Sequence, residues 1–189
     1  MASKNGDKRR AILAAALELF AENGFHGAPT SLIAQRAGIG VGTIYRYFKD
    51  KDELIHELHQ EVHGRVLARI CDGYDEGGSV RERFLFLFSR LLRLFLSEPK
   101  EFRFLEQYYY SPFAHRDELS SPPKEALMKR LLRLGRDQQL IRAAPMPVLE
   151  ALAFGPLVAL AKEHISGRLV VDDQMITLVV EAAWDGLKR

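Results

Sequence analysis

The chain has 189 residues, 47% of them hydrophobic and 28% charged, with a formal net charge of +2 at neutral pH. This composition is ordinary for a globular protein of one domain or of a small domain joined to a larger one. The sequence has no run of about eighteen uncharged apolar residues and no apolar signal core at its N-terminus. Its single cysteine, Cys71, excludes an internal disulfide. These features predict a cytoplasmic protein without a membrane span.

The charge is unevenly distributed along the sequence. Residues 1–51 contain eight Lys and Arg against four acidic residues, whereas the remainder contains nineteen basic and twenty-one acidic residues. A basic N-terminal part joined to a slightly acidic body suggests that the N-terminal end binds a polyanion.

The first predicted helix covers residues 8–23. Its apolar side chains recur at helical spacing and form one stripe: Ile12, Leu13, Ala16, Leu17 and Phe20. Gly24 supplies the left-handed position that ends this helix, and Phe25 is expected to fold back on Phe20.

Two short helices follow, separated by glycines. Pro29 suits the first position of a helix over residues 30–37, residues 38–40 ("GIG") form a tight break, and "VGTIYRYF" forms a helix over residues 41–48. Two short helices joined by a glycine-containing turn form a helix-turn-helix, whose second helix enters the major groove of DNA.

The remaining sequence repeats the same helix signals. Asp50 with Glu53, and Ser79 with Glu82, have the spacing of capping boxes that open helices at Lys51 and after residue 79. Further helices are predicted from Pro99 to Pro112, from Pro122 or Pro123 after a loop over 115–123, from Pro147 to about Ser166, and after Asp172. We therefore expect an all-α fold of about nine helices. It has an N-terminal three-helix helix-turn-helix domain (1–54) and a larger C-terminal helical bundle (55–189).

Side chains of the third helix divide into two sets. Ile44 and Phe48 are four residues apart and are expected to anchor the helix in the core, whereas Thr43, Arg46 and Tyr47 share the opposite face, where base edges would lie. The glycines at positions 40 and 42 allow close approach to a phosphate, and Thr30 and Lys51 lie at the starts of helices, where they suit phosphate oxygens.

The segment "AENGFHGAPTSLIAQRAGIGVGTIYRYFKDKDEL" resembles the DNA-binding domain of the TetR (tetracycline-repressor) family of bacterial transcription regulators, over roughly residues 8–54. The resemblance implies a homodimer that binds an inverted-repeat operator in double-stranded DNA, usually as a repressor, and releases it when a small-molecule effector enters the C-terminal domain. It also implies that eight residues occupy DNA-contacting positions: Thr30, Val41, Gly42, Thr43, Tyr45, Arg46, Tyr47 and Lys51. Gly40, Val41 and Pro29 depart from the family's usual polar residues, which leaves more of the base readout to the third helix.

Three histidines on the fourth helix are candidate metal ligands. His56, His59 and His63 fall at i, i+3 and i+7 and share a face, but a fourth ligand is not evident and one straight helix rarely encloses a metal. We therefore expect a histidine face rather than a metal site. No nucleophile–base pair or phosphate-binding loop stands out, so we expect neither catalysis nor a cofactor.

The aromatic segment "FRFLEQYYYSPF" suggests where an effector could bind. Phe102, Leu105, Tyr109 and Phe113 recur at helical spacing, which fits either a plain core or the wall of an apolar cavity with tyrosine hydroxyls. In the family this helix lies beside the effector cavity, so we expect a small hydrophobic ligand, and Glu106 leaves room for a cation.

The last two predicted helices are apolar over more than one face. A surface helix needs one apolar stripe, so the surplus fits either a homodimer contact or two helices deeply buried within one chain. The sequence as a whole predicts a ligand-responsive, sequence-specific transcriptional repressor. The alternative is an effector-independent DNA-binding protein for chromosome organisation.

Overall fold

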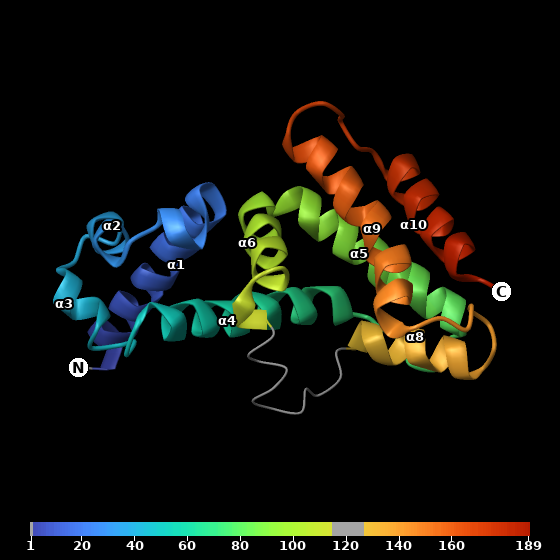
Figure 1. Cartoon of the computed structure of the whole chain (residues 1–189), viewed down its shortest axis with the longest axis horizontal. Coiled ribbons are helices and arrows are strands. Elements are labelled where there is room, and N and C mark those ends of the chain that lie inside the picture. The colour runs from blue at the N-terminus through green and yellow to red at the C-terminus, as the bar shows by residue number, and fades with distance from the viewer. Residues whose placement is uncertain (1, 115–126) are drawn as a thin grey trace. The chain divides into compact units, whose positions relative to one another are not determined.

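All regular secondary structure in the computed structural model, which describes residues 2–114 and 127–189, is helical (Figure 1). The described helices are α1 (Ala2–Gly27), α2 (Thr30–Arg36), α3 (Val41–Ile44), α4 (Lys51–Cys71), α5 (Val80–Ser97), α6 (Pro99–Tyr109), α8 (Leu127–Asp137), α9 (Met146–Ile165) and α10 (Asp173–Leu187). No strand occurs among the described residues, and the predicted all-α class is confirmed. No helix in the described part of the chain is long and apolar enough to cross a membrane.

The helices pack into two compact units. One contains α1, α2, α3, α6 and α4 as far as Arg65, and the other contains the end of α4 with α5, α8, α9 and α10. This division by packing assigns α6 to the unit that also holds the helix-turn-helix. The domain boundary predicted at residue 54 divides the chain by sequence position into a DNA-binding part and a remaining part. That functional division remains a prediction.

The first unit is built on α1, which contacts both α2 and α6. Helix α1 begins at Ala2, well before its predicted start, and its geometry is interrupted at Gly24, whose φ of 72° and ψ of 173° fit glycine best. This break lets Phe25 turn back, so that its ring centroid lies 5.3 Å from that of Phe20. Phe104 of α6 packs against both rings, at 6.3 Å from Phe20 and 5.9 Å from Phe25. An aromatic core therefore joins α6 to α1.

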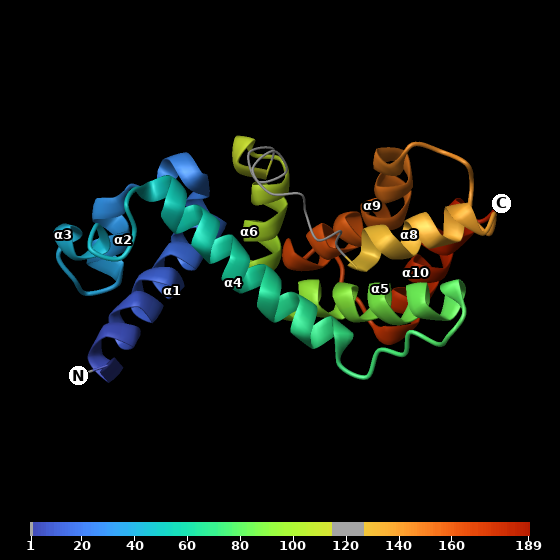
Figure 2. The same ribbon diagram turned by 90° about the horizontal axis from the view of Figure 1, so that it is seen from below.

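The second unit is organised around α5, which contacts α8, α9 and α10. Figures 1 and 2 show α5 alongside these helices, with α9 and α10 packed as a pair. Helix α5 starts with the predicted capping box. The Glu82 N–H donates to Ser79 Oγ at 3.2 Å, and the Ser79 N–H donates to the Glu82 carboxylate at 2.9 Å. Asp172 likewise caps α10 by accepting the Met175 N–H at 2.8 Å.

Two predicted boundaries need correction, and a third cannot be compared. Pro29 lies at the N-cap of α2 in extended geometry, so Thr30 is the first helical residue. Helix α6 ends at Tyr109 because Tyr110, its C-cap, leaves helical geometry before Pro112 is reached. The predicted loop over 115–123 and the helix start at Pro122 or Pro123 lie outside the described residues.

Candidate nucleic-acid interface

A glycine turn joins the two helices of the helix-turn-helix. Helix α2 ends at Arg36, and Gly38 then adopts a φ of 69°, a left-handed conformation that favours glycine. The turn closes when the Ile39 N–H donates to the Ala34 carbonyl at 3.0 Å. The orientation of α3 on α2 is therefore fixed by backbone hydrogen bonds and by one left-handed residue.

Helix α3 is shorter than the predicted helix over residues 41–48. Its regular α-helical part ends at Ile44, and the chain then winds more tightly, with N–H donation from Arg46 to the Thr43 carbonyl at 3.2 Å and from Tyr47 to the Ile44 carbonyl at 2.9 Å. The chain must leave helical geometry before Asp50, because Asp50 caps α4 by accepting the Glu53 N–H at 2.8 Å.

The inward face of α3 is anchored as predicted. Ile44 and Phe48 are each 1% exposed and belong to the core of the first unit. The Arg9 guanidinium lies over the Phe48 ring, 5.8 Å from its centroid, and forms ion pairs with Glu57 and Glu61 of α4. Arg9 therefore connects α1 to α4 next to Phe48, a core residue of the DNA-reading segment (residues 41–48).

The outward face presents polar and aromatic groups. Tyr45 is 51% exposed, and its hydroxyl lies 3.2 Å from Thr30 Oγ1, so the start of α2 and the end of α3 share a hydrogen bond. Arg46 is exposed, as are Val41 and Gly42, whereas Thr43 and Tyr47 are half-buried. The sequence offers no spacing rule that would have predicted the Thr30–Tyr45 contact.

Lys51, predicted as a phosphate contact, makes contacts within the protein. Its ammonium donates to the Phe25 carbonyl and lies 5.7 Å from the centroid of the Phe20 ring. Burial lowers the pKa of Lys51, an effect that the Asp52 carboxylate partly opposes. Lys51 thus joins the start of α4 to the end of α1, and a phosphate contact by this residue remains a prediction.

One basic group beside the reading segment was not singled out from the sequence. Lys49 is exposed in the connection between α3 and α4, and its N–H is held by the Glu53 carboxylate. Its position in the basic N-terminal part of the chain was the available signal. An exposed ammonium on a fixed backbone suits a phosphate oxygen.

The four predicted ligand residues differ in exposure. Phe102 is buried, Leu105 and Phe113 are half-buried, and Tyr109 is 56% exposed. The buried tyrosine of α6 is Tyr108, whose ring is stacked on that of His59 at 3.7 Å. Ligand binding by the four residues stays a prediction.

The histidine face of α4 has the predicted spacing. His56 is exposed, His59 and His63 are half-buried with ring centroids 5.5 Å apart, and burial lowers the pKa of His63. Within residues 2–114 and 127–189, no group of three His, Cys, Asp or Glu side chains is placed to hold a metal ion.

Comparison with known families identifies the class of protein. Residues 12–58 match the description "Bacterial regulatory proteins, tetR family", and residues 80–188 match "Tetracyclin repressor-like, C-terminal domain". The chain belongs to the TetR family of DNA-binding transcriptional regulators, which is a non-enzymatic family.

Individual relatives support this assignment to different extents. The chain is 37% identical over 79 residues to the fatty acid metabolism regulator protein of Bacillus subtilis and 43% identical over 61 residues to the transcriptional regulator UidR of Escherichia coli K12. These matches cover 42% and 32% of this chain, and only 41% and 31% of the relatives' own length. A TetR family transcription regulator from Marinobacter aquaeolei VT8 superposes with a TM-score of 0.85 at 28% identity, over 100% of this chain and 99% of that one.

Proposed function

We propose that the protein is a homodimeric repressor that binds an inverted-repeat operator and releases it when a small hydrophobic molecule binds. The observation that carries the DNA-binding part is the exposed face formed by Tyr45 and Arg46 on a segment anchored by Ile44 and Phe48. An exposed guanidinium and phenol on a rigidly held segment suit base edges and phosphates. Seven further residues complete the proposed contact surface: Thr30, Val41, Gly42, Thr43, Tyr47, Lys49 and Lys51.

The proposed dimer contact lies on α9 and α10, the last two helices. Exposed or half-buried uncharged residues form a stripe on each helix: Val148, Leu152, Pro156 and Ala159 on α9, and Met175, Leu178, Val179 and Ala182 on α10. Contiguous exposed apolar surface marks an interaction site, and a two-fold axis would bury both stripes against the same stripes of a second copy.

The proposed effector response rests on the position of α6. This helix carries Phe102, Leu105 and Tyr109, and it packs on α1 through Phe104. A ligand that prefers one arrangement of α6 would shift the population of DNA-binding conformations by its difference in affinity between the two states. Phe113 extends the same aromatic set, with its centroid 5.5 Å from that of Phe25.

The function is tested by selecting operator DNA from a random library and then screening compounds for release. We expect a palindromic consensus bound by the dimer, and release by an apolar compound. Long-chain acids belong in the screen because the name of the Bacillus subtilis relative refers to fatty acid metabolism. A Tyr109→Ala variant that responds to the compound like the wild type would move the effector site away from α6. Uniform binding to all DNA, with no releasing compound, would favour the chromosome-organising alternative.

A further inference from the structure

A carboxylate interrupts the buried apolar stripe of α9. The buried residues of this helix are Leu149, Glu150, Ala153, Leu157 and Ala161. Glu150 is only 7% exposed, and among the described residues it is the one buried residue with a charged side chain. An ionised carboxylate in this position is unfavourable unless it is paired and hydrogen-bonded.

The pairing of Glu150 is incomplete. The Lys129 ammonium of α8 lies 3.1 Å from Glu150 Oε1, but this buried oxygen accepts no hydrogen bond of good geometry. Replacing a buried ion pair by apolar residues of similar volume is often neutral or stabilising, so packing alone gives no reason for an acid here. The Lys129 side chain is 37% exposed, so its ammonium is readily solvated when it leaves the carboxylate.

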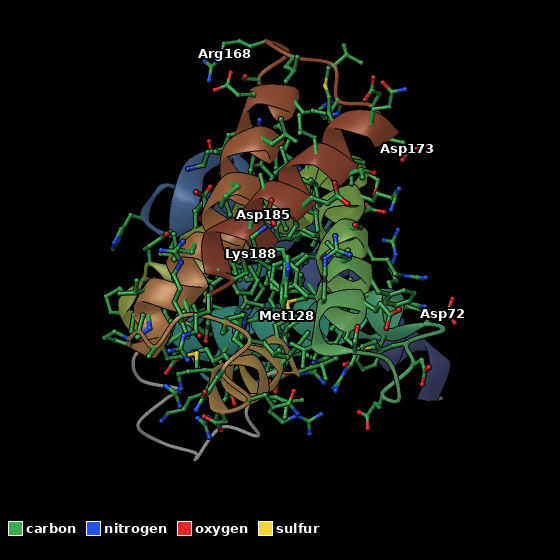
Figure 3. All side chains as sticks on the ribbon, turned by 90° about the vertical axis from the view of Figure 1, so that its right-hand side faces the viewer. Asp72, Met128, Arg168, Asp173, Asp185 and Lys188 are labelled. Carbon is green, nitrogen blue, oxygen red and sulfur yellow. The ribbon has the colours of Figure 1, made fainter. Side chains whose placement is uncertain are left out.

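One aromatic residue lies a helical turn from Glu150 along α9. Phe154 follows Glu150 by four residues on α9, and its ring centroid is 5.0 Å from that of Phe88 on α5. Phe88 is stacked on Phe84 at 4.0 Å, and Phe84 lies 5.4 Å from Trp184 of α10. Met128, labelled in Figure 3, is also buried and directly precedes Lys129. A buried carboxylate one helical turn from an aromatic residue suits an organic cation.

We infer that Glu150 is the anchor for the positively charged group of an amphipathic organic cation, whose apolar part lies against the half-buried Phe154. In the free protein the Lys129 ammonium neutralises the carboxylate, and the ligand's cation takes its place. This site is separate from the effector residues proposed on α6, so the inference goes beyond the proposed function. It concerns residues of the second unit only.

Three probes of equal chain length and different charge test the inference: decyltrimethylammonium, decanol and decanoate, each measured by calorimetry on the full-length protein. We expect the cation to bind the wild type at least tenfold more tightly than decanoate. Glu150→Gln should weaken binding of the cation at least tenfold and leave decanol unchanged. Lys129→Met should strengthen binding of the cation several-fold, because it removes the competing ammonium.

Glu163→Gln is the matched control, since Glu163 lies on the same helix but pairs with Arg168 at the surface. It should leave the affinity for all three probes unchanged. The inference is overturned if the wild type does not bind the cation, if Glu150→Gln binds it as the wild type does, or if decanoate binds best and loses affinity in Lys129→Met. Operator binding without probe, measured on each variant, separates this outcome from a failure of the proposed function. If the protein binds its operator but does not bind decyltrimethylammonium, only the present inference is overturned.

Discussion

The two units of the molecule expose different kinds of side chain. The first exposes the phenol of Tyr45 and the guanidinium of Arg46, whereas the second exposes aliphatic groups such as Leu152 and Leu178, the latter 67% exposed. Polar and aromatic groups on a basic segment suit a polyanion, whereas an uncharged aliphatic stripe suits another apolar surface. The comparison is consistent with the proposal that the first unit binds DNA and the second binds a second copy of the chain.

Ion pairs and aromatic contacts join helices in both units. In the first, ion pairs connect separate helices: Arg65 donates to Glu101 of α6 at 2.8 Å, and Glu18 pairs with both Arg36 and Lys100. In the second, Arg93 of α5 pairs with Asp173 of α10 at 2.9 Å, and α5, α9 and α10 also meet through stacked and tilted aromatic rings. Contacts between exposed charges weaken with salt, whereas apolar packing does not. Exposed ion pairs in both units are therefore expected to weaken with salt.

The largest expected effect comes from placing charge on the aliphatic stripe. Leu152→Glu or Val179→Glu should give monomers and lower operator affinity by on the order of 100-fold or more, because two linked half-site contacts become independent. Light scattering and operator titration measure the two effects. Val170→Glu is the control, since Val170 is 82% exposed in the connection between α9 and α10, outside the stripe. A wild type that is monomeric at micromolar concentration would remove the basis for this prediction.

The second prediction distinguishes base contacts from phosphate contacts in the first unit. Arg46→Ala should lower specific affinity by about 1–3 kcal/mol and relax the preference at one base position. Lys49→Ala should weaken all sequences similarly and reduce the salt dependence, because it removes a phosphate contact. Lys49 is the preferred comparison, since Lys51→Ala would also remove the hydrogen bond to the Phe25 carbonyl. Equal, sequence-independent losses for both variants would reassign Arg46 to phosphate.

The sequence predicted contacts between residues that are close in the chain, but not contacts between residues that are far apart in it. Local signals worked well: Asp50, Ser79 and Asp172 cap the helices that they were expected to cap. Helical periodicity also identified Ile44 and Phe48 as core. These predictions depend on neighbours within four residues, which a sequence displays directly.

Contacts between distant segments were beyond this reasoning. The Thr30–Tyr45 hydrogen bond and the packing of Phe104 on Phe20 depend on how helices are placed in space. The same limit explains why Glu150, four residues before Phe154, was not recognised as buried. The regular part of α3 was overestimated, because helix propensity does not show that the chain must leave helical geometry before Asp50 caps α4.

The third prediction uses a glycine that the fold does not require. A Cβ at Gly42 would meet no atom within 4 Å, and Gly42 is not among the glycines with positive φ. Gly42→Ala should therefore leave stability unchanged or raise it by up to about 1 kcal/mol. It should nevertheless weaken operator binding about tenfold, the effect of losing roughly one hydrogen bond to a charged group. Gly64→Ala on α4, which is equally open, is the control and should leave operator affinity unchanged. Operator affinity unchanged in Gly42→Ala would show that the phosphate does not approach this residue closely.

The smallest expected effect concerns Glu18, the carboxylate of α1 that pairs with Arg36 of α2 at 3.1 Å and with Lys100 of α6. Hydrogen bonds from Lys100 and Arg36 lower the pKa of Glu18 below its ordinary value of 4.5. Its stabilising contribution is therefore fully present above pH 4.5 and is lost as the pH falls through the lowered pKa of the folded state. Because these groups are largely exposed, Glu18→Gln should destabilise the protein by only about 0.2–1 kcal/mol at neutral pH. The difference from the wild type should shrink in 1 M salt and vanish in acid, as measured by urea denaturation. Glu163→Gln removes a comparable surface carboxylate from the second unit. If Glu18 also holds α2 in its reading position, only Glu18→Gln should weaken operator binding, and equal operator affinity in the two variants would limit Glu18 to a role in stability.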